Sequence, residues 1–128
     1  NAGGPGILCA DALAAQGLRV EALAEGTQRA LRELLPAEAS VANPVDMIAS
    51  ASASGYARTL ELVLGDPGVD AVISLFVRPL ATRAHDVADA IGVVATSQAA
   101  AGTPVLSVFL GADRPTPPPS GEPGVPAA

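Results

Sequence analysis

The chain has 128 residues, which is enough for one domain with a buried core. Its composition is 49% hydrophobic and 16% charged, which excludes an intrinsically disordered chain. The formal net charge is −6 and every basic residue is an arginine, so a basic groove for nucleic acid is not expected.

The sequence also indicates in which cellular compartment the protein is expected. Charged residues or glycines interrupt the apolar stretches well before the ~20 residues that a membrane span requires. No basic segment precedes an apolar one, so we identify no secretory signal. The single cysteine, Cys9, allows no intrachain disulfide. We therefore expect a cytoplasmic protein that contacts no membrane.

Composition divides the chain into two parts. Residues 1–112 mix aliphatic residues with alanine, glycine and scattered charges, whereas 113–128 contain six of the 12 prolines. The second part has no periodic apolar face. We predict one domain over 1–112 and an extended proline-rich linker or tail over 113–128.

Four segments have the apolar spacing of helices. Gly17 and Pro36 are expected to end the first two, and Ser54 to cap the third. The predicted helices are 7–16, 25–35, 54–64 and 83–95.

Three segments have the patterns of strands. The first alternates apolar and polar residues, as a strand with one solvated face does. The other two are almost wholly apolar, which is typical of strands covered on both faces. The predicted strands are 18–23, 69–77 and 105–110. The alternation of strands and helices predicts an α/β layer fold with a mainly parallel sheet.

A glycine-rich loop before the first helix is the most suggestive chemical feature. Gly3, Gly4 and Gly6 allow a tight turn and the close approach of a ligand, and Pro5 suits a first helical turn. The free amides of a helix N-terminus favour a phosphate or carboxylate. Alternatively, the glycines form only a strand-to-helix turn. Because such a loop normally follows a strand, and none precedes Asn1, we expect a piece of a longer protein.

Four blocks together resemble a known family. They occur in the chain order NAGGPG, ADAL, NPVD and DPGVDAV, at residues 1–6, 10–13, 43–46 and 66–72. In this they are similar to the flavodoxin-like ligase-CoA subdomain of the NDP-forming acyl-CoA (acetate–CoA) synthetases, which are relatives of succinyl-CoA synthetase. The resemblance covers about 1–112 and implies a flavodoxin-like three-layer fold.

The resemblance also implies a function. These synthetases reversibly convert acid, CoA and a nucleoside triphosphate into acyl-CoA, nucleoside diphosphate and phosphate through a phosphohistidine on another subdomain. The amides of Gly3, Gly4 and Gly6 would then face the phosphoryl-transfer site. CoA, ADP or ATP, and Mg are expected for the longer protein, with none bound by this chain alone.

The implied partners are the CoA-binding, phosphohistidine and ATP-grasp subdomains, together with a small-molecule acid or acyl-CoA. The same subdomain also occurs in protein lysine acetyltransferases. The alternative is therefore a regulatory module that senses acyl-CoA without catalysis. In either case we expect the isolated chain to have no turnover.

Three further residues are candidates for the rim of the site. The resemblance implies this for Asn43 and Asp46, although Asp46 could equally bond local backbone amides. Arg78 follows a predicted buried strand, at the edge of a parallel sheet where ligands bind. A solvent-exposed Arg78 beside a helix is the alternative.

No side chain is predicted to act as a catalytic group or a metal ligand. Cys9 lies on the apolar side of the first helix and is expected to be a buried structural residue. His85 has Asp86 and Asp89 nearby, but this spacing is typical of an exposed polar helix face.

Overall fold

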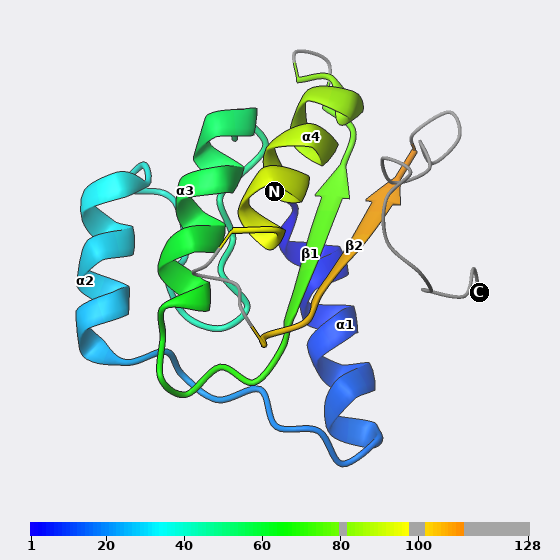
Figure 1. Cartoon of the computed structure of the whole chain (residues 1–128). Coiled ribbons are helices and arrows are strands. Elements are labelled where there is room, and N and C mark those ends of the chain that lie inside the picture. The colour runs from blue at the N-terminus through cyan, green and yellow to red at the C-terminus, as the bar shows by residue number, and fades with distance from the viewer. Residues whose placement is uncertain (80–81, 98–101, 112–128) are drawn as a thin grey trace.

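The computed structural model describes residues 1–79, 82–97 and 102–111, and within them helices surround a short parallel sheet (Figure 1). The elements follow in the order α1 (Gly3–Ala15), α2 (Glu25–Leu34), α3 (Ala53–Leu64), β1 (Val72–Val77), α4 (Ala84–Ala95) and β2 (Val105–Leu110). The predicted proline-rich segment 113–128 lies outside the described residues. No helix in the described ranges is both long and apolar enough to cross a membrane.

The sheet consists of β1 and β2, which are parallel and in register from Val72 opposite Val105 to Val77 opposite Leu110. Helix α4 connects them, as parallel strands require a crossover. The predicted α/β class with a parallel sheet is confirmed.

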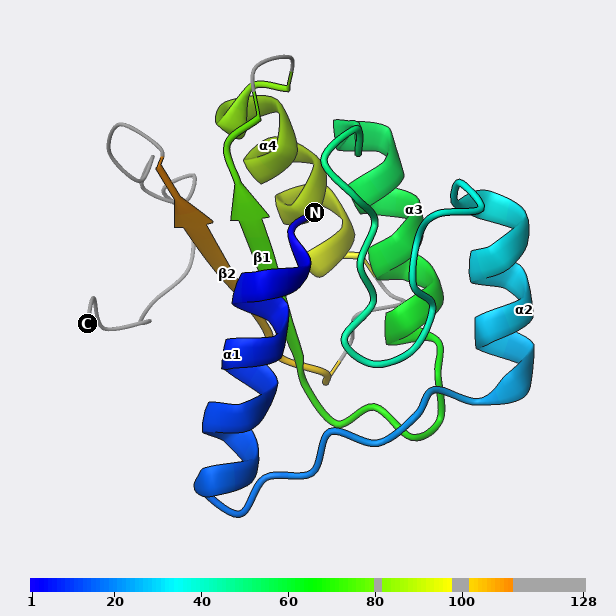
Figure 2. The same cartoon turned by 180° about the vertical axis from the view of Figure 1, so that it is seen from behind.

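The helices lie on both sides of this sheet. Figures 1 and 2 show α4 over one face of the strands and α1 over the other, with α3 beside α4. The α4 side holds the main core, in which Phe76 is fully buried. Its ring lies 5.5 Å from that of Phe109 and 5.9 Å, edge-on, from that of Tyr56. The core therefore depends on very few aromatic rings among aliphatic side chains.

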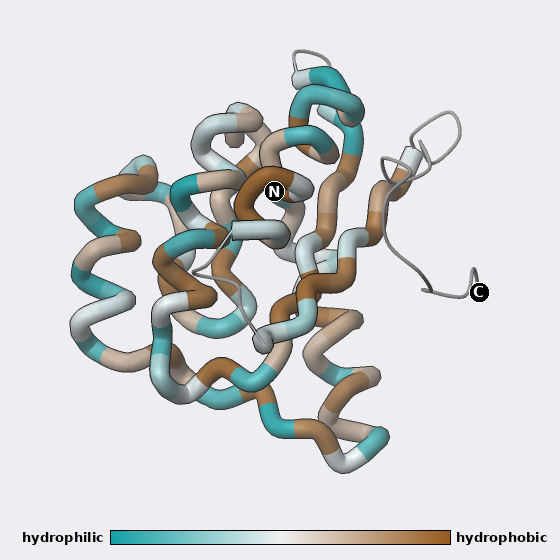
Figure 3. Tube along the Cα trace, in the orientation of Figure 1, coloured by the Kyte–Doolittle hydropathy of each residue, from teal (hydrophilic) through white to brown (hydrophobic). Residues whose placement is uncertain are grey.

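The α1 side of the sheet is only partly covered. Both strands are largely hydrophobic (Figure 3), and alternate residues point to opposite faces. Four side chains on the α1 face nevertheless remain exposed: Ile73, Leu106, Val108 and Leu110. The prediction that 105–110 is buried on both faces was wrong, because α1 does not cover β2.

Three other predictions need correction. The segment 18–23 has no strand partner in the described chain, so its alternating pattern produces no ladder. Strand β1 begins at Val72, because the amide of Val69 closes a turn onto the carbonyl of Asp66 at 3.2 Å. Helix α3 is capped by Ser52, whose hydroxyl accepts from the Gly55 amide at 3.1 Å.

Helix α1 begins earlier than predicted. Gly3, Gly4 and Gly6 lie inside its first turns and do not form a loop before it. The sequence favoured a loop because glycine is a poor helix former, at a cost of about 1 kcal/mol relative to alanine.

Candidate functional site

The N-terminus of α1 lies at the carboxyl end of β1 (Figure 2). The side-chain amide of Asn1 makes this connection with two hydrogen bonds. Its Nδ2 donates to the Val77 carbonyl and its Oδ1 accepts from the Val77 amide, each at 2.9 Å. In parallel α/β sheets, ligands bind outside this end of the strands. The first turn of α1 therefore lies at the edge where a ligand is expected.

Two amides in this first turn lack a helical acceptor by position. The first amide of α1 that donates to a carbonyl four residues earlier is that of Gly6, which bonds to the Ala2 carbonyl at 3.4 Å. Gly3 and Gly4 come before it, so their amides have no such acceptor. Pro5 has no N–H to offer. Gly4 is exposed, with no atom within 4 Å of where its Cβ would stand. The donors that could face an anion are thus those of Gly3 and Gly4.

The carboxylate of Asp46 lies beside this turn. A Cβ on Gly3 would stand 2.7 Å from Asp46 Oδ2, so only glycine fits there without a shift. The other oxygen, Oδ1, accepts from the amide of Ile48 at 3.0 Å. Backbone bonds between Asp46 and Ser40, at 2.9 and 3.0 Å, hold the segment in place. One side of the helix end therefore already faces a negative charge, and the Gly4 side is open.

The three predicted rim residues have different surroundings. Asp46 is at the first turn of α1, as described. Arg78 is exposed and follows Val77, and its amide donates to the Leu110 carbonyl at 3.1 Å. The side-chain Nδ2 of Asn43 instead donates to the Glu21 carbonyl at 2.9 Å. The structure thus brings Asp46 and the backbone of Arg78 to the strand edge beside α1, while Asn43 ties two loops together.

Gly6 has a packing role. It is buried, and its Cβ position lies 3.5 Å from the Pro44 ring, which follows a cis peptide bond. A Cβ at Gly6 would make ordinary van der Waals contact with Pro44, so helix α1 packs closely on the segment that carries Asp46. Neither a clash nor a positive φ requires glycine at this position.

Tyr56 is a site residue that the sequence reasoning missed. Its hydroxyl donates to the Leu75 carbonyl at 2.9 Å and accepts from the amino group of Asn1 at 3.0 Å. Burial, and then the negative charge of Asp46, raise the pKa of Tyr56. Burial also lowers the pKa of the Asn1 amino group, which Asp46 partly offsets. The only signal in the sequence was that Tyr56 is the sole tyrosine.

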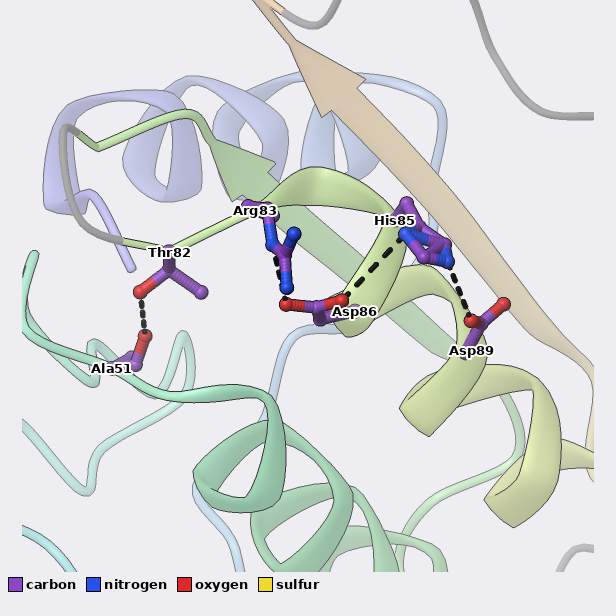
Figure 4. A network of polar contacts seen from close by, with 6 residues as sticks. All are labelled: Ala51, Thr82, Arg83, His85, Asp86 and Asp89. Carbon is purple, nitrogen blue, oxygen red and sulfur yellow. Dashed lines mark hydrogen bonds and ion pairs between the residues drawn. The ribbon is translucent and has the colours of Figure 1, made fainter.

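The remaining candidates lie away from α1's first turn. Cys9 is half-buried, so the expectation of a buried thiol was wrong. His85 is exposed as predicted, and Figure 4 shows it between two carboxylates. Its Nε2 lies 3.2 Å from Asp89 and its Nδ1 3.6 Å from Asp86, which also pairs with Arg83 at 3.1 Å. These ion pairs are exposed and contribute little to stability.

An α/β fold with a helix N-terminus at the carboxyl end of its strands is shared by many ligand-binding domains. Comparison with known proteins identifies the family among them. Residues 1–113 match the model of the ligase-CoA domain family, and the chain belongs to that family.

Individual relatives agree with this assignment. The chain is 44% identical over 111 residues to the alpha subunit of acetate–CoA ligase [ADP-forming] II from Pyrococcus furiosus, covering 86% of the chain and 24% of that protein. A crystal structure from Pyrococcus horikoshii OT3 matches with a TM-score of 0.81 and 42% identity, over 88% of the chain and 26% of the other.

A dinucleotide-forming acetyl-coenzyme A synthetase 1 from Ca. Korarchaeum cryptofilum, in its apo form, has a TM-score of 0.72 and 28% identity. It is matched over 88% of the chain and 24% of its own length. The chain therefore spans about a quarter of the length of these relatives, and most of each relative lies outside the matched part.

Tyr56 offers a direct test of this geometry. Because it is the sole tyrosine, the phenolate absorbance of the chain reports on it alone. We expect the folded chain to show no ionisation near pH 10, where the urea-unfolded chain titrates. Since the folded pKa is raised, its contribution to stability is present below pH 10 and is lost as the pH rises above it. A folded chain that titrates near pH 10 would show that the hydroxyl is not buried against β1.

Proposed function

We propose that this chain is the ligase-CoA subdomain of an NDP-forming acyl-CoA synthetase. The complete protein would convert acid, CoA and a nucleoside triphosphate into acyl-CoA, nucleoside diphosphate and phosphate. The family membership of residues 1–113, together with relatives named as acetate–CoA ligases, carries this proposal. The same names support the synthetase, and the regulatory module of a lysine acetyltransferase stays the alternative.

Within that reaction, α1 would contribute backbone dipoles and no reacting side chain. Its first turn lies at the carboxyl end of β1, where the amides of Gly3 and Gly4 would face a ligand, and Gly4 is exposed. Such an arrangement supports an anion seat for a phosphoryl group or a carboxylate, because preorganised donors stabilise charge that develops during transfer.

Asp46 would weaken anion binding at the first turn of α1. Its carboxylate beside Gly3 benefits from the positive end of the helix and repels a second anion. A phosphoryl group would therefore bind weakly to the isolated chain and would be released again. Weak binding suits a site through which a phosphoryl group only passes.

The other parts of the reaction would come from outside this chain. The CoA-binding, phosphohistidine and ATP-grasp subdomains would be its partners, and CoA, ADP or ATP, and Mg would be bound by the complete protein. The substrate would be a small-molecule acid or its acyl-CoA. A cytoplasmic location stays a prediction.

The proposed reaction is tested on the complete protein together with any partner subunit. We expect acetate, CoA and ATP to yield acetyl-CoA, ADP and phosphate in equal amounts, and the 128-residue chain alone to yield none. High-performance liquid chromatography of the nucleotides and thioesters measures both. Transfer of acetyl groups from acetyl-CoA to protein lysines, without ADP formation, would instead support the regulatory alternative.

The anion seat is tested separately by phosphate titration of the isotope-labelled chain, followed by NMR. We expect the amide signals of Gly3 and Gly4 to move over tens of millimolar phosphate. The Asp46→Asn variant should bind about fivefold more tightly, because two charges a few ångströms apart in water repel by roughly 1 kcal/mol.

The matched control is Asp70→Asn, which changes the net charge equally but alters an exposed residue before the amino end of β1. It should leave phosphate binding unchanged. Equal gains in both variants would mean that only net charge matters, and signals that stay fixed would contradict an anion seat at α1.

A further inference from the structure

Ile48 has a backbone conformation that a β-branched side chain disfavours. Its φ is +59°, and within the described ranges no other residue besides glycine has a positive φ. In this left-handed region the Cβ lies too close to the following carbonyl oxygen, and a branched side chain adds to the crowding. Such strain persists only where the surrounding structure imposes it, and strained residues are concentrated at functional sites.

The carboxylate of Asp46 makes the shortest hydrogen bond to Ile48. Its Oδ1 accepts from the Ile48 amide at 3.0 Å, whereas the Ile48 carbonyl accepts from the Ala51 amide at 3.2 Å. A hydrogen bond to an ionised group is stronger than one between neutral groups. Two backbone bonds to Ser40 fix the main chain of Asp46, so its side chain is the part that can turn. The Asp46 carboxylate is therefore the group that imposes this conformation.

The strained stretch is short and lies between two buried residues. Met47 precedes it and Ala51 follows it, and both belong to the main core. The Ala51 carbonyl also accepts from the hydroxyl of Thr82, just before α4, at 3.1 Å (Figure 4). Between them Ile48 is half-buried, and the two residues after it are exposed. The backbone of 48–50 can therefore change conformation while the residues on either side stay in the core.

The same carboxylate connects this stretch to α1. Its other oxygen, Oδ2, lies 2.7 Å from where a Cβ of Gly3 would stand, beside the proposed anion seat. An anion held by the amides of Gly3 and Gly4 would repel the Asp46 carboxylate. If the side chain turns away, its bond to Ile48 breaks.

The strain at Ile48 changes the cost of moving Asp46. Breaking the bond between the carboxylate and the Ile48 amide is unfavourable, but it allows the backbone of Ile48 to leave the left-handed region. A hydrogen bond to a charged group and the strain of a left-handed residue have comparable free energies. The relief of strain therefore offsets much of the loss of the bond, so the carboxylate is easier to displace than an unstrained one.

We propose that Asp46 is a positioning residue that holds Ile48 in its left-handed conformation, and that an anion at the first turn of α1 releases Ile48 by displacing this carboxylate. The first half stands on the contacts of Asp46 alone. The second half rests on the proposed function, because it requires the anion seat. Asp46 then occupies the side of the seat when no anion is bound and leaves it at a small net cost when a phosphoryl group arrives.

The first half is tested by urea unfolding of Ile48→Gly and Ile48→Ala, which both remove the side chain and differ in their tolerance of a positive φ. We expect the unfolding equilibrium constant of the glycine variant to be about fivefold smaller, because alanine is strained in the left-handed region. With Asp46→Ala added to each, the difference should vanish or reverse, since a relaxed backbone favours alanine. Asp46→Asn keeps an oxygen acceptor and should keep the preference for glycine.

The second half is tested by phosphate titration of the same two variants at constant ionic strength, followed by NMR. The alanine variant should bind phosphate about fivefold more tightly than the glycine variant, because only the alanine variant has strain to release. In the unmodified chain, the amide signal of Ile48 should move with the same midpoint as those of Gly3 and Gly4. A purely structural role of Asp46 would leave the two affinities equal.

The outcomes separate the two halves. Equal stability of the glycine and alanine variants, or a glycine preference that persists with Asp46→Ala, would overturn the role of Asp46 in holding Ile48. Equal phosphate affinities, with Gly3 and Gly4 signals that move, would overturn the release alone. Gly3 and Gly4 signals that stay fixed in every variant would contradict the anion seat and with it the release, while the unfolding comparison still decides the first half.

Discussion

The pairing of the Asn1 side chain with the backbone of Val77 is the constraint on which the site depends. By bonding both the amide and the carbonyl of one strand residue, it places the start of α1 at the carboxyl end of β1. This connection helps to fix where the free amides of Gly3 and Gly4 lie relative to the sheet. Tyr56 reinforces it by bonding the next carbonyl along the same edge. A helix dipole becomes useful only when the fold directs it to a place where a ligand can bind.

Electrostatics then limits what the helix end can do. Asp46 lies against Gly3 because a carboxylate at the positive end of a helix is favourable. The same carboxylate raises the cost of bringing in a phosphoryl group. In the proposed role, the balance between these two effects would make the end of α1 a place of transient contact with a phosphoryl group. Gly6 packs against Pro44, two residues before Asp46, and so brings α1 close to the segment that carries this carboxylate.

The sequence predicted the elements whose patterns are local. Helices α2, α3 and α4 and the two strands lie close to where their apolar periodicity indicated, and the family resemblance was confirmed. The failures share a physical cause. The segment 18–23 has the pattern of a strand, but a strand forms only with a neighbour, which a local pattern cannot supply. Asp46 and Gly3 lie 43 positions apart in sequence, and no periodicity signals their approach. Tyr56 bonds to the backbone carbonyl of Leu75, and because every residue has such a group, no sequence motif signals the contact.

The claim that the first turn of α1 is an anion seat at the strand edge is tested most directly by a crystal structure of the complete protein grown with phosphate. The account predicts a phosphate oxygen within hydrogen-bond distance of the amides of Gly3 and Gly4, with the Asp46 carboxylate displaced from Gly3. A phosphate bound elsewhere, with Asp46 itself bonded to both amides, would contradict it.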